Sequence, residues 1–176
     1  MKKAFQLKAI TGFVVALLIS TGSFAQKTIP SPRDSTSGVV HGAHISINYG
    51  APSVRGRKIF GGLEAYGKIW RAGANEATFF TTDKDIMVEG KKLPAGRYSF
   101  FATPGEKEWT VIFNSASAPN MWGINRQGAN DDPAKDVLVA KVTPKTVPMT
   151  ERLKYVITKN GFELVWETTS VPVTIK

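Results

Sequence analysis

The sequence predicts an all-β protein that folds as a single antiparallel β-sandwich, immunoglobulin-like or jelly-roll-like in shape. Short runs of β-branched and aromatic residues alternate with glycine, proline and asparagine turn signals, at the spacing of about eight to ten short strands. No segment of residues 26–176 has the apolar stripe of a helix of normal length. The chain has the usual length of one domain, so we expect two packed sheets around one core.

The first 25 residues are typical of a secretory signal peptide. Lysines precede an apolar run over residues 9–19, and Ser23-Phe24-Ala25 supplies small residues at the positions that a signal peptidase reads. The apolar run is shorter than the roughly 20 residues that cross a membrane. We therefore expect cleavage near Ala25, a periplasmic or secreted location, and no membrane span in the mature chain; an uncleaved anchor is the less favoured alternative.

Residues 26–38 combine prolines with hydroxyl side chains and offer little to bury, which predicts a flexible leader. The β-sandwich domain is then expected over residues 39–176. The chain contains no cysteine, so neither a disulfide nor a thiol nucleophile is available. Burial and backbone pairing alone must hold this exported fold together.

The first strand is expected over Val39–Tyr49, where apolar residues share one parity. A glycine-rich, irregular stretch follows over residues 50–67, because such a density of glycine indicates turns and close backbone approaches. Residues 74–82 are expected to form the next strand. The block that joins the glycine-rich stretch to this strand contains Trp70, Arg71, Asn75 and Glu76.

Further along, residues 85–89 are expected to pair with residues 97–103, and residues 109–114 to pair back onto 97–103. Both parities of Val111-Ile112-Phe113 are apolar, which predicts an interior strand covered on both faces. The other aromatic residues on these strands are expected in the core.

Residues 115–133 form a long loop without periodicity, of the kind that is often a binding or mobile segment. Strands are expected again over residues 136–142, and as a hairpin of residues 152–158 and 162–167. The hairpin turn contains Asn160-Gly161, a pair suited to tight turns. Residues 171–175 are expected at a sheet edge because they include Pro172.

The net charge of +9 overstates the basicity of the mature chain. Part of it belongs to the signal peptide, and no lysine- or arginine-rich run or nucleic-acid module is present, so nucleic-acid binding is not expected. The two histidines, His41 and His44, lie three residues apart on an expected strand and point to opposite faces. We therefore expect no metal site and no cofactor.

Four blocks resemble one known family. They are Tyr49-Gly50-Ala51-Pro52-Ser53-Val54-Arg55-Gly56-Arg57-Lys58-Ile59-Phe60-Gly61, Tyr66-Gly67-Lys68-Ile69-Trp70-Arg71-Ala72-Gly73-Ala74-Asn75-Glu76-Ala77-Thr78, Pro94-Ala95-Gly96-Arg97-Tyr98 and Trp109-Thr110-Val111-Ile112-Phe113-Asn114. Over residues 39–158 the chain is similar to the bacterial family catalogued as domain of unknown function 2911. The resemblance implies an exported bacterial protein without an established activity, and it supplies no catalytic residue.

The residues themselves indicate a binding site. Arg55, Arg57 and Arg71 can form a cationic wall, with Asn75 as an orienting amide and Trp70 or Trp122 as an aromatic floor. Such a set suits a small anionic ligand or a sugar that stacks on an indole. The function expected from the sequence is a non-catalytic binding or envelope-associated module with an unknown oligomeric state.

Two alternatives remain open at this point. A hydrolase or isomerase for a small polar or carbohydrate substrate would use Glu76 as acid or base, and would need a second carboxylate or an equivalent partner. A purely structural interpretation pairs Arg71 with Glu76 as a buried ion pair at the entry of the strand. The sequence does not decide whether the protein is an enzyme.

Overall fold

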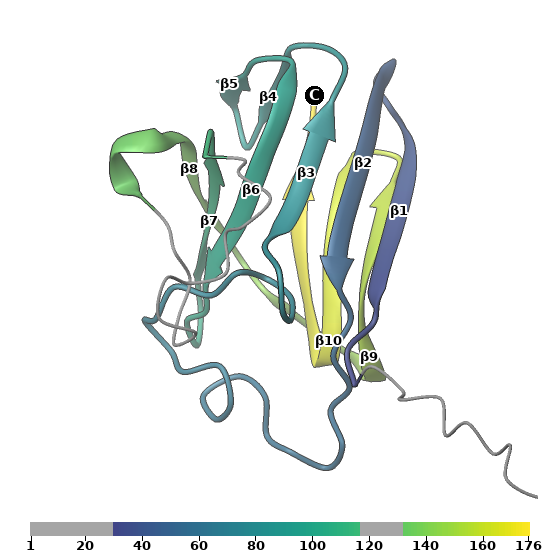
Figure 1. Cartoon of the computed structure of the whole chain (residues 1–176), viewed down its shortest axis with the longest axis vertical. Coiled ribbons are helices and arrows are strands. Elements are labelled where there is room, and N and C mark those ends of the chain that lie inside the picture. The colour runs from purple at the N-terminus through teal and green to yellow at the C-terminus, as the bar shows by residue number, and fades with distance from the viewer. Residues whose placement is uncertain (1–29, 117–131) are drawn as a thin grey trace, which may run out of the picture.

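The computed structural model describes residues 30–116 and 132–176, and almost all of its regular structure is β-strand. Figure 1 shows the strands in two layers, with an irregular loop at one end. The elements in chain order are β1 (Arg33–Val40), β2 (Ala43–Gly50), β3 (Thr78–Thr82), β4 (Ile86–Val88), β5 (Lys91–Leu93), β6 (Gly96–Thr103), β7 (Trp109–Asn114), η1 (Pro133–Lys135), β8 (Asp136–Val142), β9 (Lys145–Thr158) and β10 (Gly161–Thr174).

The front layer in Figure 1 is a six-stranded antiparallel sheet with the order β1-β2-β3-β6-β7-β8. The back layer contains the β9-β10 hairpin, extended by the short β4-β5 hairpin. Backbone hydrogen bonds join these hairpins, because Met87 N donates to Lys176 O and Lys176 N donates to Met87 O, both at 2.8 Å. The prediction of an all-β sandwich is confirmed.

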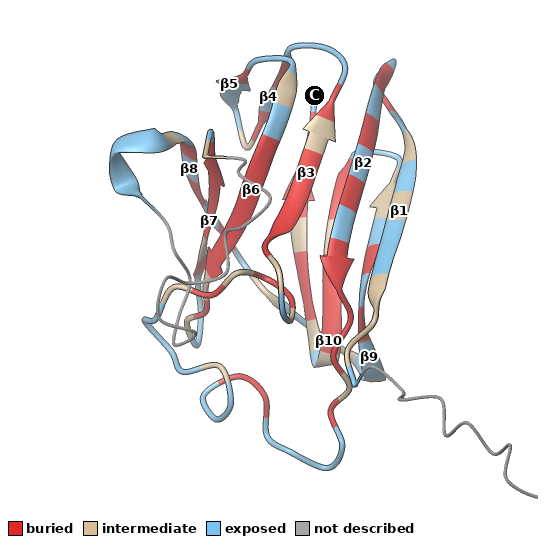
Figure 2. Ribbon diagram, viewed as in Figure 1, coloured by how far each residue is buried: buried red, intermediate tan, exposed pale blue. Residues whose placement is uncertain are grey.

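The core lies between the layers, and period-2 alternation puts one face of each front strand into it. On β6 the inward residues are Tyr98, Phe100 and Ala102, all buried. Phe100 packs edge-on against Phe113 of β7 and against Phe162 of β10, at centroid distances of 5.2 and 5.5 Å. Figure 2 shows this buried band along β2, β3, β6 and β7. Most of the aromatic residues expected in the core lie there, but Phe79 is buried on the opposite face of the front sheet, under the guanidinium of Arg97.

The start of the domain differs from the prediction. The expected strand over Val39–Tyr49 is a hairpin, in which β1 and β2 are joined by His41 and Gly42 at φ 47° and 81°. Positive φ at both central residues is the geometry of a tight hairpin turn, and sequence alternation alone does not reveal it. β1 begins at Arg33, so the second half of the expected flexible leader is a strand.

The pairing expected for residues 85–89 is also wrong. β4 pairs with β5 instead, through a turn at Glu89 and Gly90 with φ of 47° and 77°. β6 is therefore free to pair with β3 on one side and β7 on the other. The expected strand over residues 74–82 begins only at Thr78, because Asn75 has a φ of 63° and interrupts an extended chain.

The second half of the chain follows the prediction more closely. β7 pairs with β6 and β8 and is buried on both faces, as expected. β8 covers the expected residues, and β9 and β10 form the expected hairpin with Thr158 opposite Gly161. β10 folds back near Glu167, at φ 54°, so that Ile175 N donates to Asn160 O at 2.7 Å. Most of the expected 115–133 loop lies outside the described residues.

Candidate functional site

The glycine-rich stretch forms an irregular loop at one end of the sandwich; we call residues 51–77 the basic loop. Gly50 lies at the entry of this loop, and Ala74 N donates to Gly50 O at 3.1 Å. A Cβ atom at Gly50 would lie 1.9 Å from the carbonyl oxygen of Ala74. Only glycine permits this approach of the two backbones, which brings the far end of the loop back to the end of β2.

Trp70 anchors the basic loop in the core. Its backbone forms two hydrogen bonds with Ala102 of β6, at 2.7 and 2.9 Å. Its indole is buried, stacks on Trp166 at 5.9 Å, and donates from Nε1 to Gly73 O at 3.2 Å. The structure therefore buries the ring of Trp70, which was expected as the aromatic floor of a binding site. The other expected floor, Trp122, lies outside the described residues.

The turn after Trp70 is held by buried hydroxyl groups. Ala72, at φ 52°, presents its carbonyl oxygen to the Tyr155 hydroxyl at 2.7 Å and to Thr78 Oγ1 at 3.0 Å. Complete burial raises the pKa of Tyr155 well above its ordinary value, so this donor stays protonated. Much of the distinctive block from Trp70 to Thr78 thus serves to build a corner of the fold.

Arg55 and Arg57 brace the first half of the loop. Arg57 donates from Nε to Val54 O at 3.0 Å and from a terminal nitrogen to Ser53 O at 2.7 Å. Arg55, at φ 51°, donates from its guanidinium to Pro30 O at 3.2 Å. Both side chains therefore hold loop or leader carbonyls, and both residues are exposed to solvent.

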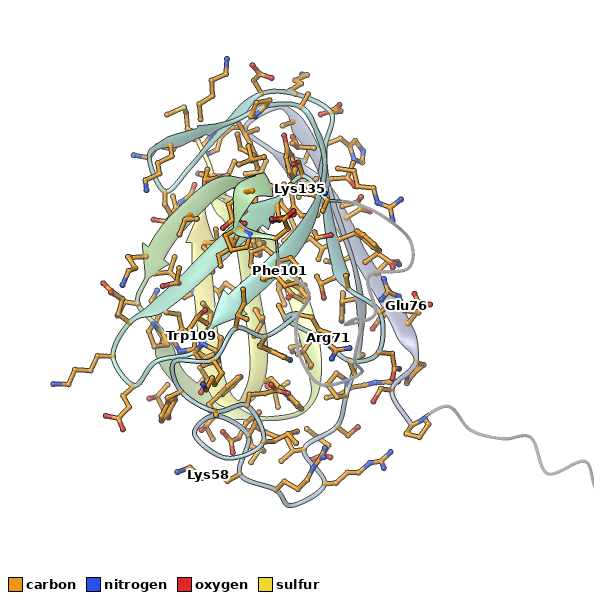
Figure 3. The ribbon with its side chains drawn as sticks, turned by 60° about the vertical axis from the view of Figure 1, so that its left-hand side comes forward. Lys58, Arg71, Glu76, Phe101, Trp109 and Lys135 are labelled. Atoms are coloured by element: carbon orange, nitrogen blue, oxygen red, sulfur yellow. The ribbon has the colours of Figure 1, made fainter. Side chains whose placement is uncertain are left out.

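Arg71, Asn75 and Glu76 come together at the exit of the loop, on the side of the molecule where Figure 3 labels Arg71 and Glu76. Arg71 donates to Asn75 O at 2.5 Å, and Asn75 Nδ2 donates to Ser31 O at 2.9 Å. The Glu76 carboxylate lies 3.8 Å from the guanidinium of Arg33, which also donates to Ala77 O at 3.2 Å. Sequence reasoning missed Arg33 because it lies in the segment expected to be a flexible leader.

Glu64 is the titratable group of the basic loop that sequence reasoning passed over. Burial raises its pKa to about 7, although the positive charges of Arg71 and Arg57 act in the opposite direction. At neutral pH about half of the molecules therefore carry a neutral Glu64. The sequence feature that could have drawn attention to Glu64 is that it is the one acidic residue between Ala51 and Arg71, in a segment otherwise rich in basic residues.

The described residues contain no group of three or more His, Asp or Glu side chains that could hold a metal ion. His44 contributes its backbone N–H to Asp83 Oδ1 at 2.6 Å, and His41 occupies the β1-β2 turn. Within the same residues, no helix is long and apolar enough to cross a membrane.

Cavities lie at both ends of the described part of the sandwich. One, of about 140 Å³, lies between the basic loop, the β6-β7 turn and the start of β9; its lining includes Phe60, Tyr66, Glu106, Trp109, Lys145 and Thr169. The other, of about 430 Å³, lies at the opposite end and is lined by His41, Asn160, Thr174, Ile175 and Lys176. Neither cavity includes an arginine of the predicted site.

Comparison with known proteins adds a family but no activity. No curated protein and no solved structure matched the chain. One family model, described as a protein of unknown function (DUF2911), matches residues 31–175. The match begins shortly before β1 and ends just after β10, so it spans the whole sandwich. The chain therefore belongs to the DUF2911 family.

Proposed function

We propose that this protein is an exported binding module that holds a small anionic ligand, acidic sugars included, on its basic loop. The observation that supports this proposal is the group of Glu64, Arg57 and Arg71. A carboxyl group with a pKa of about 7 compensates the two guanidinium charges only in part at neutral pH. The loop therefore presents net positive charge to a ligand, and guanidinium groups suit carboxylates and phosphates.

The contacts around the group favour a preformed site. Arg57 is fixed by Ser53 O and Val54 O, and Arg71 is fixed by Asn75 O. A side chain that is already ordered loses less conformational entropy when a ligand arrives, which favours binding. Arg55 and Asn75 are included in the proposed site as further contacts, whereas Trp70 supports it from within the core.

Protonation of Glu64 gives the proposal a distinctive pH dependence. As the pH falls through about 7, Glu64 becomes neutral and the two arginines lose their compensating charge. Anions should therefore bind more tightly at pH 6 than at pH 8. In a Glu64→Gln variant the side chain is neutral throughout, and the affinity should no longer change with pH across this range.

The test is a thermal-shift and calorimetric screen of the purified protein against organic acids, acidic sugars and neutral sugars, at pH 6 and pH 8. A ligand that prefers the folded state raises the melting temperature by mass action. Arg71→Ala should abolish the effect, whereas Lys68→Ala, which removes an exposed charge from the same loop, should retain most of it. An anion that stabilises both variants equally contradicts the proposal.

The same carboxyl group favours a second candidate, a hydrolase or isomerase that uses Glu64 as its acid or base. A pKa near the working pH is what general acid–base catalysis requires. Glu76 is less suited to this role, because its carboxylate is nearly half exposed and lies beside Arg33. Turnover of a bound sugar or ester, lost in Glu64→Gln while binding remains, would favour the enzyme over the binding module.

Export rests on residues 1–25 alone, where the pattern of a signal peptide precedes the domain. Amino-terminal sequencing of the mature protein from the producing cell should begin at Gln26. A mature chain that begins at Met1 would contradict export by this route.

A further inference from the structure

The cavity of about 140 Å³ beside the basic loop is a candidate site separate from the arginine group. Segments far apart in the sequence meet there: the basic loop, the β6-β7 turn, the start of β9 and the end of β10. Its inner wall contains Phe60 and Trp109, which are buried and pack edge-on at 4.7 Å. Phe60 also contacts Trp70 and Trp166, so this wall is the end of the aromatic core.

Backbone contacts hold the outer wall in position. Gly67 N donates to Pro104 O at 2.8 Å, which ties the basic loop to the β6-β7 turn. The ring of Tyr66 lies against Gly61, where an added Cβ atom would come within 2.6 Å of the ring. Tyr66 is 40 % exposed, so its ring forms a partly accessible side of the cavity. The aromatic walls are therefore set before any ligand enters.

The charges of the cavity are opposite in sign and come from different segments. Glu106 lies on the β6-β7 turn and Lys145 at the start of β9. In the part of the chain that the structure describes, neither takes part in an ion pair, whereas the neighbouring Glu108 pairs with Lys141. The cavity thus offers one carboxylate and one ammonium group that are both available to a ligand.

The size of the cavity narrows the ligand further. Its volume of about 140 Å³ lies below the roughly 300–1,000 Å³ of pockets that hold drug-sized ligands. The cavity therefore suits a small molecule. The hydroxyl groups of Thr146 and Thr169 add hydrogen-bonding partners to the lining.

We propose that this cavity binds a small zwitterion, of the chemical class of the small α-amino acids. The ligand's ammonium group faces Glu106, its carboxylate faces Lys145, and its carbon atoms rest against Phe60 and Tyr66. An anion would be attracted by Lys145 but repelled by Glu106, and a cation would meet the reverse. A molecule that carries both charges satisfies both groups at once.

The experiment compares matched ligands on the intact protein. Glycine, L-alanine and L-serine are titrated by calorimetry and by NMR shifts of the Tyr66 and Trp109 signals, beside acetate and ethylamine, which each carry one of the two charges. We expect saturable shifts for the zwitterions, and affinities at least tenfold weaker for acetate and ethylamine. Equal binding of acetate and L-alanine would overturn the proposal, and so would no binding of any zwitterion at tens of millimolar.

Substitutions of the two charged residues test whether L-alanine binds in this cavity. Glu106→Gln and Lys145→Met should each weaken L-alanine binding at least tenfold, while Glu108→Gln and Lys107→Met, which change the same charges nearby, should leave it within twofold. The double variant Glu106→Lys with Lys145→Glu should recover part of the affinity, because the zwitterion can bind in the opposite direction. Loss of binding in the control variants to the same extent would show that general surface charge, and not this cavity, holds the ligand.

This proposal does not depend on the anion site. Arg71→Ala should leave L-alanine binding unchanged, and Glu106→Gln should leave anion binding to the basic loop unchanged. A zwitterion that binds wild type but not Arg71→Ala would contradict the assignment to this cavity.

Discussion

Two acidic residues at opposite ends of the sandwich have pKa values shifted in opposite directions, although both have positively charged neighbours. Asp85, before the β4-β5 hairpin, lies 2.8 Å from Lys92 Nζ, and this hydrogen bond lowers the pKa of the exposed carboxyl group. Glu64, in the basic loop, has two arginines as electrostatic neighbours, yet its pKa is raised to about 7. Solvent access therefore outweighs the number of positive neighbours, since burial penalises the charged form.

The raised pKa of Glu64 requires that the basic loop be held against the core, and Trp70 holds the loop there. Trp70→Ala removes a buried indole that stacks on Trp166, and should lower the free energy of unfolding by about 3–5 kcal/mol. If the loop loosens, water reaches Glu64 and its pKa should fall toward 4.5. Urea denaturation and NMR titration of Glu64 measure the two effects.

Leu63→Ala is the matched control for this change, because it removes a half-exposed apolar side chain from the same loop. It should cost less than about 1 kcal/mol. If Trp70→Ala were no more destabilising than Leu63→Ala, the loop would not depend on the core for its position.

The charge of Glu64 should couple stability to pH. Its pKa is higher in the folded state than in the unfolded chain, so the folded protein binds more protons between about pH 4.5 and 7. The stability contributed by Glu64 is therefore fully present below about pH 4.5 and is lost as the pH rises through 7, by about 1–2 kcal/mol after allowance for partial solvent exposure. Urea denaturation at pH 4.5, 6 and 8 measures this fall.

In Glu64→Gln the contribution of this group to the fall should disappear, which leaves the variant more stable than wild type at pH 8. If the free energy of unfolding depended on pH identically in wild type and Glu64→Gln, Glu64 would be as accessible to water as Asp85. The two carboxyl groups would then not differ in burial.

The smallest effect is expected at the β4-β5 hairpin. Lys92→Ala removes the partner of Asp85, but both side chains are solvated, so the melting temperature at neutral pH should change by less than about 2 °C. The pKa of Asp85 is lowered in the folded state, so any stabilisation is present above the unfolded pKa and is lost in acid. Thermal melts at pH 7 and pH 2, with and without 1 M salt, should show a small difference that acid and salt remove.

Strands that are defined by neighbouring residues could be predicted from the sequence, whereas features set by backbone conformation or by distant contacts could not. β7, β8 and the β9-β10 hairpin were predictable because an apolar run or a turn between adjacent strands defines them locally. The β1-β2 and β4-β5 turns were missed because His41 and Glu89 adopt positive φ, a conformation that is uncommon for both residue types. Trp70 was expected as the aromatic floor of a binding site, but the structure buries its ring against Trp166.

The candidate site shows the same division. The all-β class, the family and the gathering of arginines in one glycine-rich segment can be predicted from the chain alone, because composition and alternation are local properties. Three relations depend on the packed fold: Arg33 lies beside Glu76, the partly buried Glu64 lies near Arg57 and Arg71, and Glu106 and Lys145 share a cavity. The first and the third join residues far apart in the chain, and the second depends on burial, so all three exist only once the two layers have packed.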